Sequence, residues 1–194
     1  MKGLFLLLPL LAACASTSPQ SQPLRCEGAL APGASAADLV ARFGAEKVKS
    51  ASVYVGEGQY EPGTVLFPGS RSSIRIIWKD AKGQRNPDSI RAGARNTTLT
   101  SYFGIGLGTD LQAVEKINGK PFTLHGFGWD YSGTVASWDG GELDRATGGD
   151  CKLLLRFAPR ATGIALDGSE IFSSRHPEMR NLNPEVYDLL LVYP

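Results

Sequence analysis

The sequence predicts an α+β fold in which two similar helix-then-antiparallel-meander units pack as one body, with the helices on one face of the sheet. Two short amphipathic segments, one in each half of the chain, follow a capping residue and end at a glycine. After each segment the apolar residues take a period of two, which is typical of half-buried strands. Clusters of Gly, Pro, Asp and Asn separate these runs and favour hairpin connections. Helices that cover one face of an antiparallel sheet define the α+β class.

The first helix is predicted over 37–43, ADLVARF. Ser35 and Asp38 have the spacing of an N-cap hydroxyl and a carboxylate that together satisfy the first amides of a helix. Gly44 ends the helix, because glycine readily adopts the left-handed conformation that follows a last turn. The apolar face, which we expect to be buried, consists of Leu39, Val40 and Phe43.

The second helix is predicted over 111–117, LQAVEKI, and ends at Asn118-Gly119. It follows the glycine-rich stretch 104–110, GIGLGTD, which raises the question of a phosphate site at the helix start. The stretch lacks the third glycine of the dinucleotide fingerprint, and a meander rather than a parallel strand follows the helix. We therefore expect a tight turn in which Thr109 caps the helix, since residues 109–112 have the S/T-x-x-E/Q form of a capping box.

The strands form two successive meanders that share the tripeptide Gly-Thr-Val, at 63–65 and 133–135. A single short helix with three or four strands is too small to be stable alone, so the two units are expected to share a core. The first unit covers 33–100, and the second covers 101–194 with a C-terminal extension. The predicted strands are 52–55, 64–67, 73–78 and 89–94 in the first unit and 122–129, 134–138, 151–157 and 188–194 in the second.

This layout resembles that of a known family. Tandem helix-then-meander units, each opening with a capped helix that ends in glycine, resemble the β-lactamase inhibitory protein architecture. A single unit is similar to the small lipoprotein of the outer-membrane β-barrel assembly machinery. The match consists of the repeat layout, Phe43-Gly44 after the first helix and a lipoprotein-like start, and covers roughly residues 33–158. The longer second half and the tail at 160–194 depart from the pattern.

The chain start predicts export and lipid anchoring. Residues 1–13 have a positive Lys2 and then an apolar run too short to span a bilayer, which indicates a signal peptide. Leu11-Ala-Ala-Cys14 resembles the lipobox of bacterial lipoprotein precursors. That resemblance implies cleavage before Cys14, a diacylglycerol on its sulfur and an acylated amine, with the anchor in the outer membrane facing the periplasm because Ala15 follows the cysteine. Residues 14–32 are then a lipidated flexible tether, rich in Ser, Pro and Gln.

Charge and cysteine content restrict the function further. Without residues 1–13 the chain has equal numbers of basic and acidic residues, so no basic excess points to nucleic acid. Once Cys14 is lipidated, Cys26 and Cys151 remain in an oxidising compartment, and a disulfide between them is the simplest assignment. The alternative is a redox or metal site, although there is no CxxC motif and no histidine nearby.

The most distinctive segment is 126–141, GFGWDYSGTVASWDGG. Trp129, Tyr131 and Trp138 lie on or beside one predicted hairpin, and His125 alternates with Trp129 along the strand. One interpretation is that the tryptophans fill the core against the helices. The other is an aromatic recognition surface, because Trp and Tyr bury much area at little entropic cost.

The sequence therefore predicts a non-enzymatic, periplasm-facing lipoprotein that binds another envelope protein through its sheet surface. One alternative is a glycan-binding module that stacks Trp129, Tyr131 and Trp138 on peptidoglycan or lipopolysaccharide sugars. Another is a small hydrolase, which would need His125 or His176 beside a carboxylate or serine. No cofactor and no metal site is predicted, because the calcium-loop pattern is missing and the acidic residues fall in expected hairpin turns: Asp130, Asp139, Glu142, Asp144 and Asp150.

Overall fold

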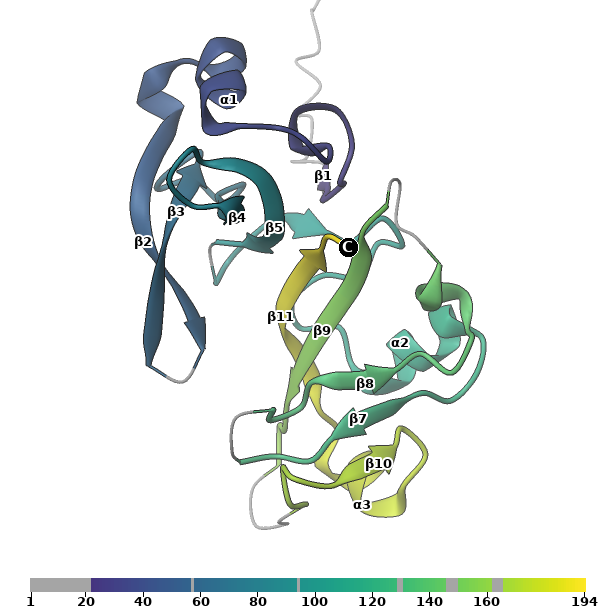
Figure 1. Cartoon of the computed structure of the whole chain (residues 1–194). Helices are drawn as coiled ribbons and strands as arrows, with labels where there is room; N and C mark the ends of the chain where they lie inside the picture. The colour runs from purple at the N-terminus through teal and green to yellow at the C-terminus, as the bar shows by residue number, and fades with distance from the viewer. Residues whose placement is uncertain (1–21, 57, 94, 129–130, 146–149, 162–165) are drawn as a thin grey trace, which may run out of the picture.

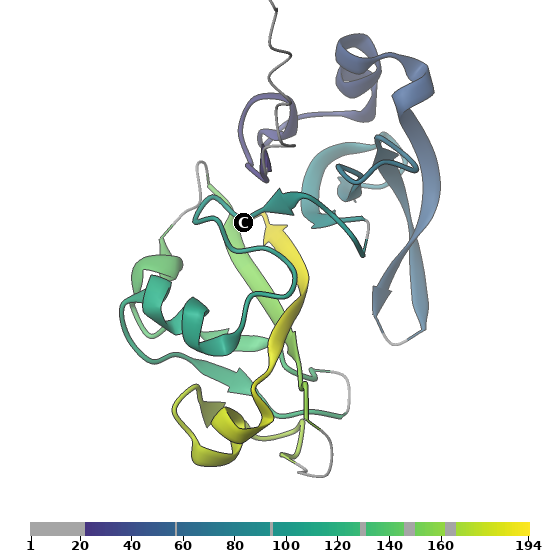
Figure 2. The same ribbon diagram turned by 180° about the vertical axis from the view of Figure 1, so that it is seen from behind.

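The computed structural model describes residues 22–56, 58–93, 95–128, 131–145, 150–161 and 166–194, which form a mixed α and β fold with antiparallel sheets (Figures 1 and 2). The predicted signal segment 1–13 and Cys14 lie outside the described residues. The end of the predicted tether does not: Leu24, Cys26 and Leu30 are buried in the core. Their apolar side chains anchor a segment whose composition otherwise favours a flexible chain.

A six-stranded antiparallel sheet forms the centre of the molecule, with strand order β2-β3-β4-β5-β11-β9. The first four strands are a simple meander, as the sequence predicts, but β3 and β5 begin earlier than the predicted strands 64–67 and 89–94 because their hairpin turns are shorter than expected. β11 then pairs with both β5 and β9, which brings the end of the chain into the middle of the sheet. The strands are β2 (Val48–Gly56), β3 (Gln59–Leu66), β4 (Ile74–Asp80), β5 (Arg85–Ala92), β9 (Lys152–Ala158) and β11 (Glu185–Val192).

Helix α1 (Ala36–Phe43) begins and ends as predicted. The Ser35 side chain accepts from the Asp38 amide, the Asp38 side chain accepts from the Ser35 amide, and Gly44 follows the last turn. Leu39 is buried and Phe43 is half-buried, whereas Val40 is exposed. The helix is only eight residues long, so its stability depends on this cap and on the buried face.

Helix α2 (Leu111–Asn118) also has its predicted end at Gly119, but its cap differs from the prediction. Asp110, not Thr109, is the N-cap, and its carboxylate accepts from the Ala113 amide at 2.7 Å. The Thr109 hydroxyl instead donates to the Gly106 carbonyl at 2.8 Å. Either Thr109 or Asp110 could have capped the helix. Because the Thr109 hydroxyl is hydrogen-bonded in the turn at Gly106, Asp110 is the residue that caps it.

The second half of the chain divides its strands between two sheets. β7 (Thr123–His125) and β8 (Val135–Ser137) pair in a three-stranded antiparallel sheet of order β10-β7-β8, with β10 (Ile171–Ser173) from the tail. The predicted strand at 122–129 is therefore wrong in length, because regular pairing ends at His125. At Gly126 the chain passes so close to residue 167 that a Cβ would lie 2.1 Å from the Asp167 carbonyl oxygen.

The tail that departs from the family pattern forms regular structure that the sequence analysis did not predict. Besides β10 it contains α3 (Pro177–Leu182), whose Met179 and Leu182 are buried in the core. Near the start of the chain β1 (Gln22–Pro23) pairs in parallel with β6 (Leu99–Thr100). Three short 3₁₀ turns complete the described elements, namely Gly28–Leu30, Ala45–Lys47 and Glu142–Asp144.

Both Gly-Thr-Val tripeptides lie where two strands come into close contact. A Cβ at Gly63 would be 2.5 Å from the carbonyl oxygen of Ile76 in β4, and one at Gly133 would be 1.8 Å from that of Phe157 in β9. Gly133 accepts from the Phe157 amide, and Thr134 forms an isolated bridge with Arg156. Through this contact the small sheet is linked to the edge of the large one.

One hydrophobic core contains the buried side chains of all three α-helices. Leu39 of α1, Val114 of α2 and Met179 of α3 belong to the same cluster as the inward residues of the six-stranded sheet, such as Ile76 and Leu191. The helices and the inward face of that sheet therefore share one core. A disulfide joins Cys26 to Cys151 and connects the start of the folded region to the approach to β9, in agreement with the cysteine assignment.

Candidate functional site

The face of the six-stranded sheet opposite the core carries a pocket. Because strand side chains alternate, the residues between the core positions of β4, β5, β11 and β9 all point to this face. Pairing places Arg75 opposite Arg91, Arg91 opposite Leu190 and Leu190 opposite Leu154, in one row across four strands. We call this surface the open face; its defining residues are Arg75, Ile77, Ser89, Arg91, Leu154, Arg156, Asp188, Leu190 and Val192.

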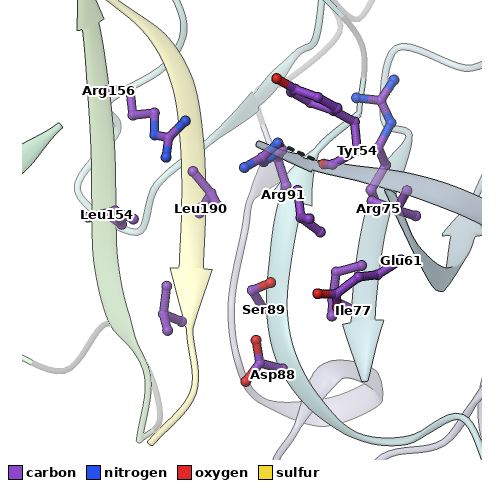
Figure 3. A pocket seen from close by; sticks show the side chains of 13 residues that line it. Tyr54, Glu61, Arg75, Ile77, Asp88, Ser89, Arg91, Leu154, Arg156 and Leu190 are labelled. Atoms are coloured by element: carbon purple, nitrogen blue, oxygen red, sulfur yellow. Dashed lines mark hydrogen bonds between the residues drawn. The ribbon is translucent and has the colours of Figure 1, made fainter. Parts of the chain in front are cut away.

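The pocket has a volume of about 260 Å³ and crosses the junction between β5 and β11 (Figure 3). Apolar side chains of Ile77, Leu154 and Leu190 line it, together with charged groups. In Figure 3 the guanidinium groups of Arg75, Arg91 and Arg156 lie at the same end as Tyr54, and Asp88 lies at the other end. The pocket is therefore basic at one end and acidic at the other.

Arg91 is held in place at the basic end. It donates to the Tyr54 carbonyl oxygen at 3.2 Å, and its Nε lies 3.4 Å from Asp188 Oδ1. The two side chains of this ion pair are only 15% and 13% exposed. Burial raises the pKa of the Asp188 carboxyl, although the charges of Arg91, Arg156 and Arg75 act in the opposite direction.

The other two arginines of the pocket are less completely paired. Arg156 lies opposite Asp188 in the pairing of β9 with β11, but its Nε is buried and has no hydrogen-bond partner among the described residues. Arg75 is exposed, and its guanidinium group makes no hydrogen bond to another described residue. The charges of all three arginines act on Asp188, but Arg91 is the one that forms an ion pair with it among the described residues.

Exposed tyrosines lie beside the open face. Tyr54 and Tyr60, which pair across the β2–β3 hairpin, are 43% and 63% exposed, and their rings meet edge to face at 5.4 Å. Tyr187, at a bulge within the pairing of β11 with β9, is also exposed. Tyrosine and arginine are enriched at protein interfaces, where each buries a large area.

The aromatic surface predicted around the second hairpin is only partly present. Trp138 is a core residue, 6% exposed, with Nε1 donating to the Leu153 carbonyl at 3.1 Å and its ring packed against Phe122. Assigning Trp138 to a recognition surface was therefore wrong. Tyr131 is 61% exposed and stacks on His125 at 5.2 Å. Trp129 lies outside the described residues.

Because Trp138 has no free ring face, it cannot stack on a sugar as the glycan-binding alternative requires. The hydrolase interpretation would need a histidine beside a carboxylate or serine. His125 Nδ1 and His176 Nδ1 are both buried without a hydrogen-bond partner within the part of the chain described. The buried Ser174 hydroxyl donates to Glu115 at 2.5 Å rather than to an imidazole.

Glu115 of α2 is the centre of a network that connects α2 to the tail. Its carboxylate accepts from Ser174, from Arg175 at 3.1 Å and from Arg180 at 2.7 Å. Burial alone raises the pKa of Glu115, but the hydrogen bonds from Ser174 and Arg175 and the positive charge of Arg180 together lower it. This arrangement packs α3 and β10 against α2.

The glycine-rich stretch 104–110 uses its amides within the chain. Gly108 donates to the Val186 carbonyl, Leu111 donates to Pro184, and Ala113 donates to the Asp110 side chain. Gly104 and Gly108 have positive φ, which a tight turn requires. The stretch docks the start of α2 onto the start of β11.

Sequence reasoning missed the arginines of the open face. Its strands 73–78 and 151–157 already placed Arg75 and Arg156 at polar positions between apolar ones. That alternation indicates that these side chains leave the core, but it does not indicate that they meet. Their convergence depends on β11 pairing between β5 and β9.

No three or more His, Cys, Asp or Glu residues are grouped for metal binding in the described ranges. In the predicted acidic cluster, Asp144 accepts from the Gly140 amide and Glu142 pairs with Arg145, whereas Asp130 lies outside the described residues. No helix within the described ranges combines the length and apolar composition needed to cross a membrane.

Comparison of the chain with protein-family models, with curated proteins and with solved structures found no significant match.

Proposed function

We propose that this protein is a non-enzymatic lipoprotein, anchored through Cys14 on the periplasmic side of the outer membrane, that binds another envelope protein through its open face. The observation that carries the proposal is the open face itself. Six strands present a broad surface on the side away from the core, with a pocket, the ion pair of Arg91 with Asp188, two further arginines and adjacent exposed tyrosines. Such a surface provides the aromatic and arginine anchors of a protein interface.

We further propose that the fold consists of two related units. α1 is followed by β2, β3, β4 and β5, and α2 is followed by β7, β8, β9 and β11. The Gly-Thr-Val tripeptides occupy matching places, with Gly63 close to the next strand, β4, and Gly133 close to the next strand, β9. The last strands of the two units, β5 and β11, pair antiparallel with each other. β10 and α3 are then an insertion before the last strand of the second unit.

In-cell photo-crosslinking tests the binding proposal. A photoreactive phenylalanine replaces Ser89 or Val65, whose side chains point to the open face by strand alternation, and Lys116 on the exposed side of α2 serves as the matched control. We expect one protein adduct from both face positions and none from Lys116. Glycan adducts, or equal labelling at all three positions, would contradict the proposal.

The proposed anchor has its own test. Replacement of Cys14 by serine is expected to move the protein from the outer-membrane fraction to the soluble periplasmic fraction, because several acyl chains are needed for stable membrane attachment. Cell fractionation with immunoblotting measures the distribution. Recovery of Cys14→Ser with the outer membrane to the same extent as the wild type would contradict lipid anchoring.

A further inference from the structure

Three arginines line the basic end of the pocket, and one of them is ion-paired there. Arg75, Arg91 and Arg156 each carry a permanent charge with five N–H donors, and among the described residues Arg91 forms an ion pair with Asp188. Arg91 donates one N–H to the Tyr54 carbonyl oxygen, and its Nε is paired with the Asp188 carboxylate. The donors of Arg75 and the buried Nε of Arg156 remain without acceptors among the described residues.

Part of the basic end is covered by protein. The side chains of Arg91 and Asp188 are 15% and 13% exposed, so water screens them less than it screens surface charges. Hydrogen bonds between guanidinium and carboxylate groups are stronger than neutral ones and are often bidentate. An incoming carboxylate would therefore meet Arg91, which is already held in place, next to Arg156 and the exposed Arg75.

The size and the lining of the rest of the pocket limit which molecules can present that carboxylate. Its volume of about 260 Å³ lies just below the range of about 300–1,000 Å³ that is typical of sites for whole small ligands. Leu154, Leu190 and Ile77 offer an apolar floor for the methylene groups of a side chain. Glu61 and Asp88 line the pocket too; Asp88 lies at the end away from the arginines, and Glu61 lies beside Ile77 between the two ends (Figure 3).

We infer that this pocket receives an acidic side chain of the protein partner, held between Arg75, Arg91 and Arg156, with a basic residue of the same partner segment directed toward Glu61 and Asp88. The inference rests on the proposed function, since it names the chemistry of the partner at that surface. The charge polarity of the pocket fixes the direction in which an extended segment lies along β5.

Blocked tripeptides provide the direct test. The probes are N-acetyl-Glu-Ala-Lys-amide and its neutral counterpart N-acetyl-Gln-Ala-Lys-amide, titrated into the lipidated full chain in a non-ionic detergent. The readout is the NMR shift of the arginine Nε–H signals. We expect saturable binding of the Glu peptide in the millimolar range and binding of the Gln peptide weaker by about tenfold, the factor that corresponds to one charge-assisted hydrogen bond.

Variants locate the binding. Arg75→Gln and Arg156→Gln are each expected to weaken the Glu peptide by about five- to tenfold and to leave the Gln peptide unchanged. Arg145→Gln, at an exposed arginine whose partner is Glu142, is the matched control and should have no effect. Circular dichroism spectra identify any variant that fails to fold, and the exposed Arg75 makes such failure least expected there.

The outcomes separate this inference from the proposed function. Equal binding of both peptides, or an unchanged Glu peptide affinity in Arg75→Gln and Arg156→Gln, overturns the inference even if crosslinking at Ser89 recovers a protein. A charge preference that Arg75→Gln removes supports the inference even if crosslinking finds no partner. Co-sedimentation with purified peptidoglycan that Arg75→Gln abolishes would assign the carboxylate to a cell-wall peptide and overturn the protein partner.

Discussion

Asp188 shows at the scale of one residue how the open face is held together. Its carboxylate pairs with Arg91 in a largely covered position, and burial raises its pKa even with three arginines nearby. Ionised Asp188 therefore attracts the neighbouring arginines, but its ionisation lowers the stability of the folded state. Such a balance is common for buried ion pairs, whose desolvation offsets their attraction.

The sign of this pKa shift gives a prediction. A carboxyl whose pKa is higher in the folded state destabilises the fold above that pKa, and the cost is relieved as pH falls and the folded protein takes up the proton. Asp188→Asn is therefore expected to gain stability relative to the wild type at pH 7 and to lose that advantage toward pH 4. Urea denaturation at both pH values measures the difference. A variant whose relative stability is lower at pH 7 than at pH 4 would refute it.

Trp138 and Tyr131 differ in burial although they lie seven positions apart around one hairpin. Trp138→Phe removes the donor to the buried Leu153 carbonyl and part of the ring that fills the core, so we expect a loss of about 2–4 kcal/mol. Tyr131→Ala, at an exposed ring, is expected to change stability by less than about 0.5 kcal/mol. Chemical denaturation of both variants checks the contrast, and similar losses would show that the burial assignment is incorrect.

At the scale of elements, α2 owes its position to contacts at its N-terminus and at its middle. Asp110 and the start of β11 hold its N-terminus, and Glu115 connects its middle to β10 and α3. Apart from the cap by Asp110, these contacts join residues far apart in the sequence. A short helix of this kind is stabilised mainly by packing rather than by its own propensity.

Glu115→Gln tests the network between α2 and the tail. Because the pKa of Glu115 is lowered by folding, its ionised form contributes stability above about pH 4.5 that is lost as pH falls through the lower folded value. We expect Glu115→Gln to cost about 1–3 kcal/mol at pH 7 and progressively less in acid. Thermal or urea unfolding against pH measures it. Glu142→Gln, at a more exposed ion pair, is the control and should change stability by less than about 1 kcal/mol.

At the scale of the whole molecule, the two halves of the large sheet are joined by a short contact. β5 and β11 pair over three residues, whereas β11 and β9 pair over seven. The disulfide between Cys26 and Cys151 adds a covalent connection, since Cys26 precedes the first meander and Cys151 precedes β9. The disulfide therefore links the two halves of the large sheet covalently near the core.

Removal of this disulfide is expected to destabilise the protein strongly. The cysteines are 125 positions apart, so the double variant Cys26→Ser/Cys151→Ser should lose up to about 5 kcal/mol in the chain-entropy description. Urea denaturation with and without reductant measures the loss. Cys14→Ser keeps the disulfide and serves as control; a double variant within about 1 kcal/mol of it would contradict the expected role of the bridge.

The sequence by itself determined the local features of this protein. The ends of α1 and α2, the hairpin positions of the first meander and the pairing of Cys26 with Cys151 follow from caps, periodicity and cysteine count, which depend on near neighbours or on elimination. The competition between Thr109 and Asp110 was decided by a turn at Gly106 that the capping pattern does not contain. The length of β7 was decided by the approach of Asp167 to Gly126.

Only the tertiary structure decided which of these elements meet. Period-two alternation places Arg75, Arg91 and Arg156 away from the core, but their common site exists because β11 inserts between β5 and β9. The burial of Trp138 likewise depends on its contact with Leu153 in another strand. Strand pairing between distant segments is not encoded in any local pattern, because period two is the same whichever neighbour a strand takes. The charge cluster of the candidate site is therefore a product of the topology.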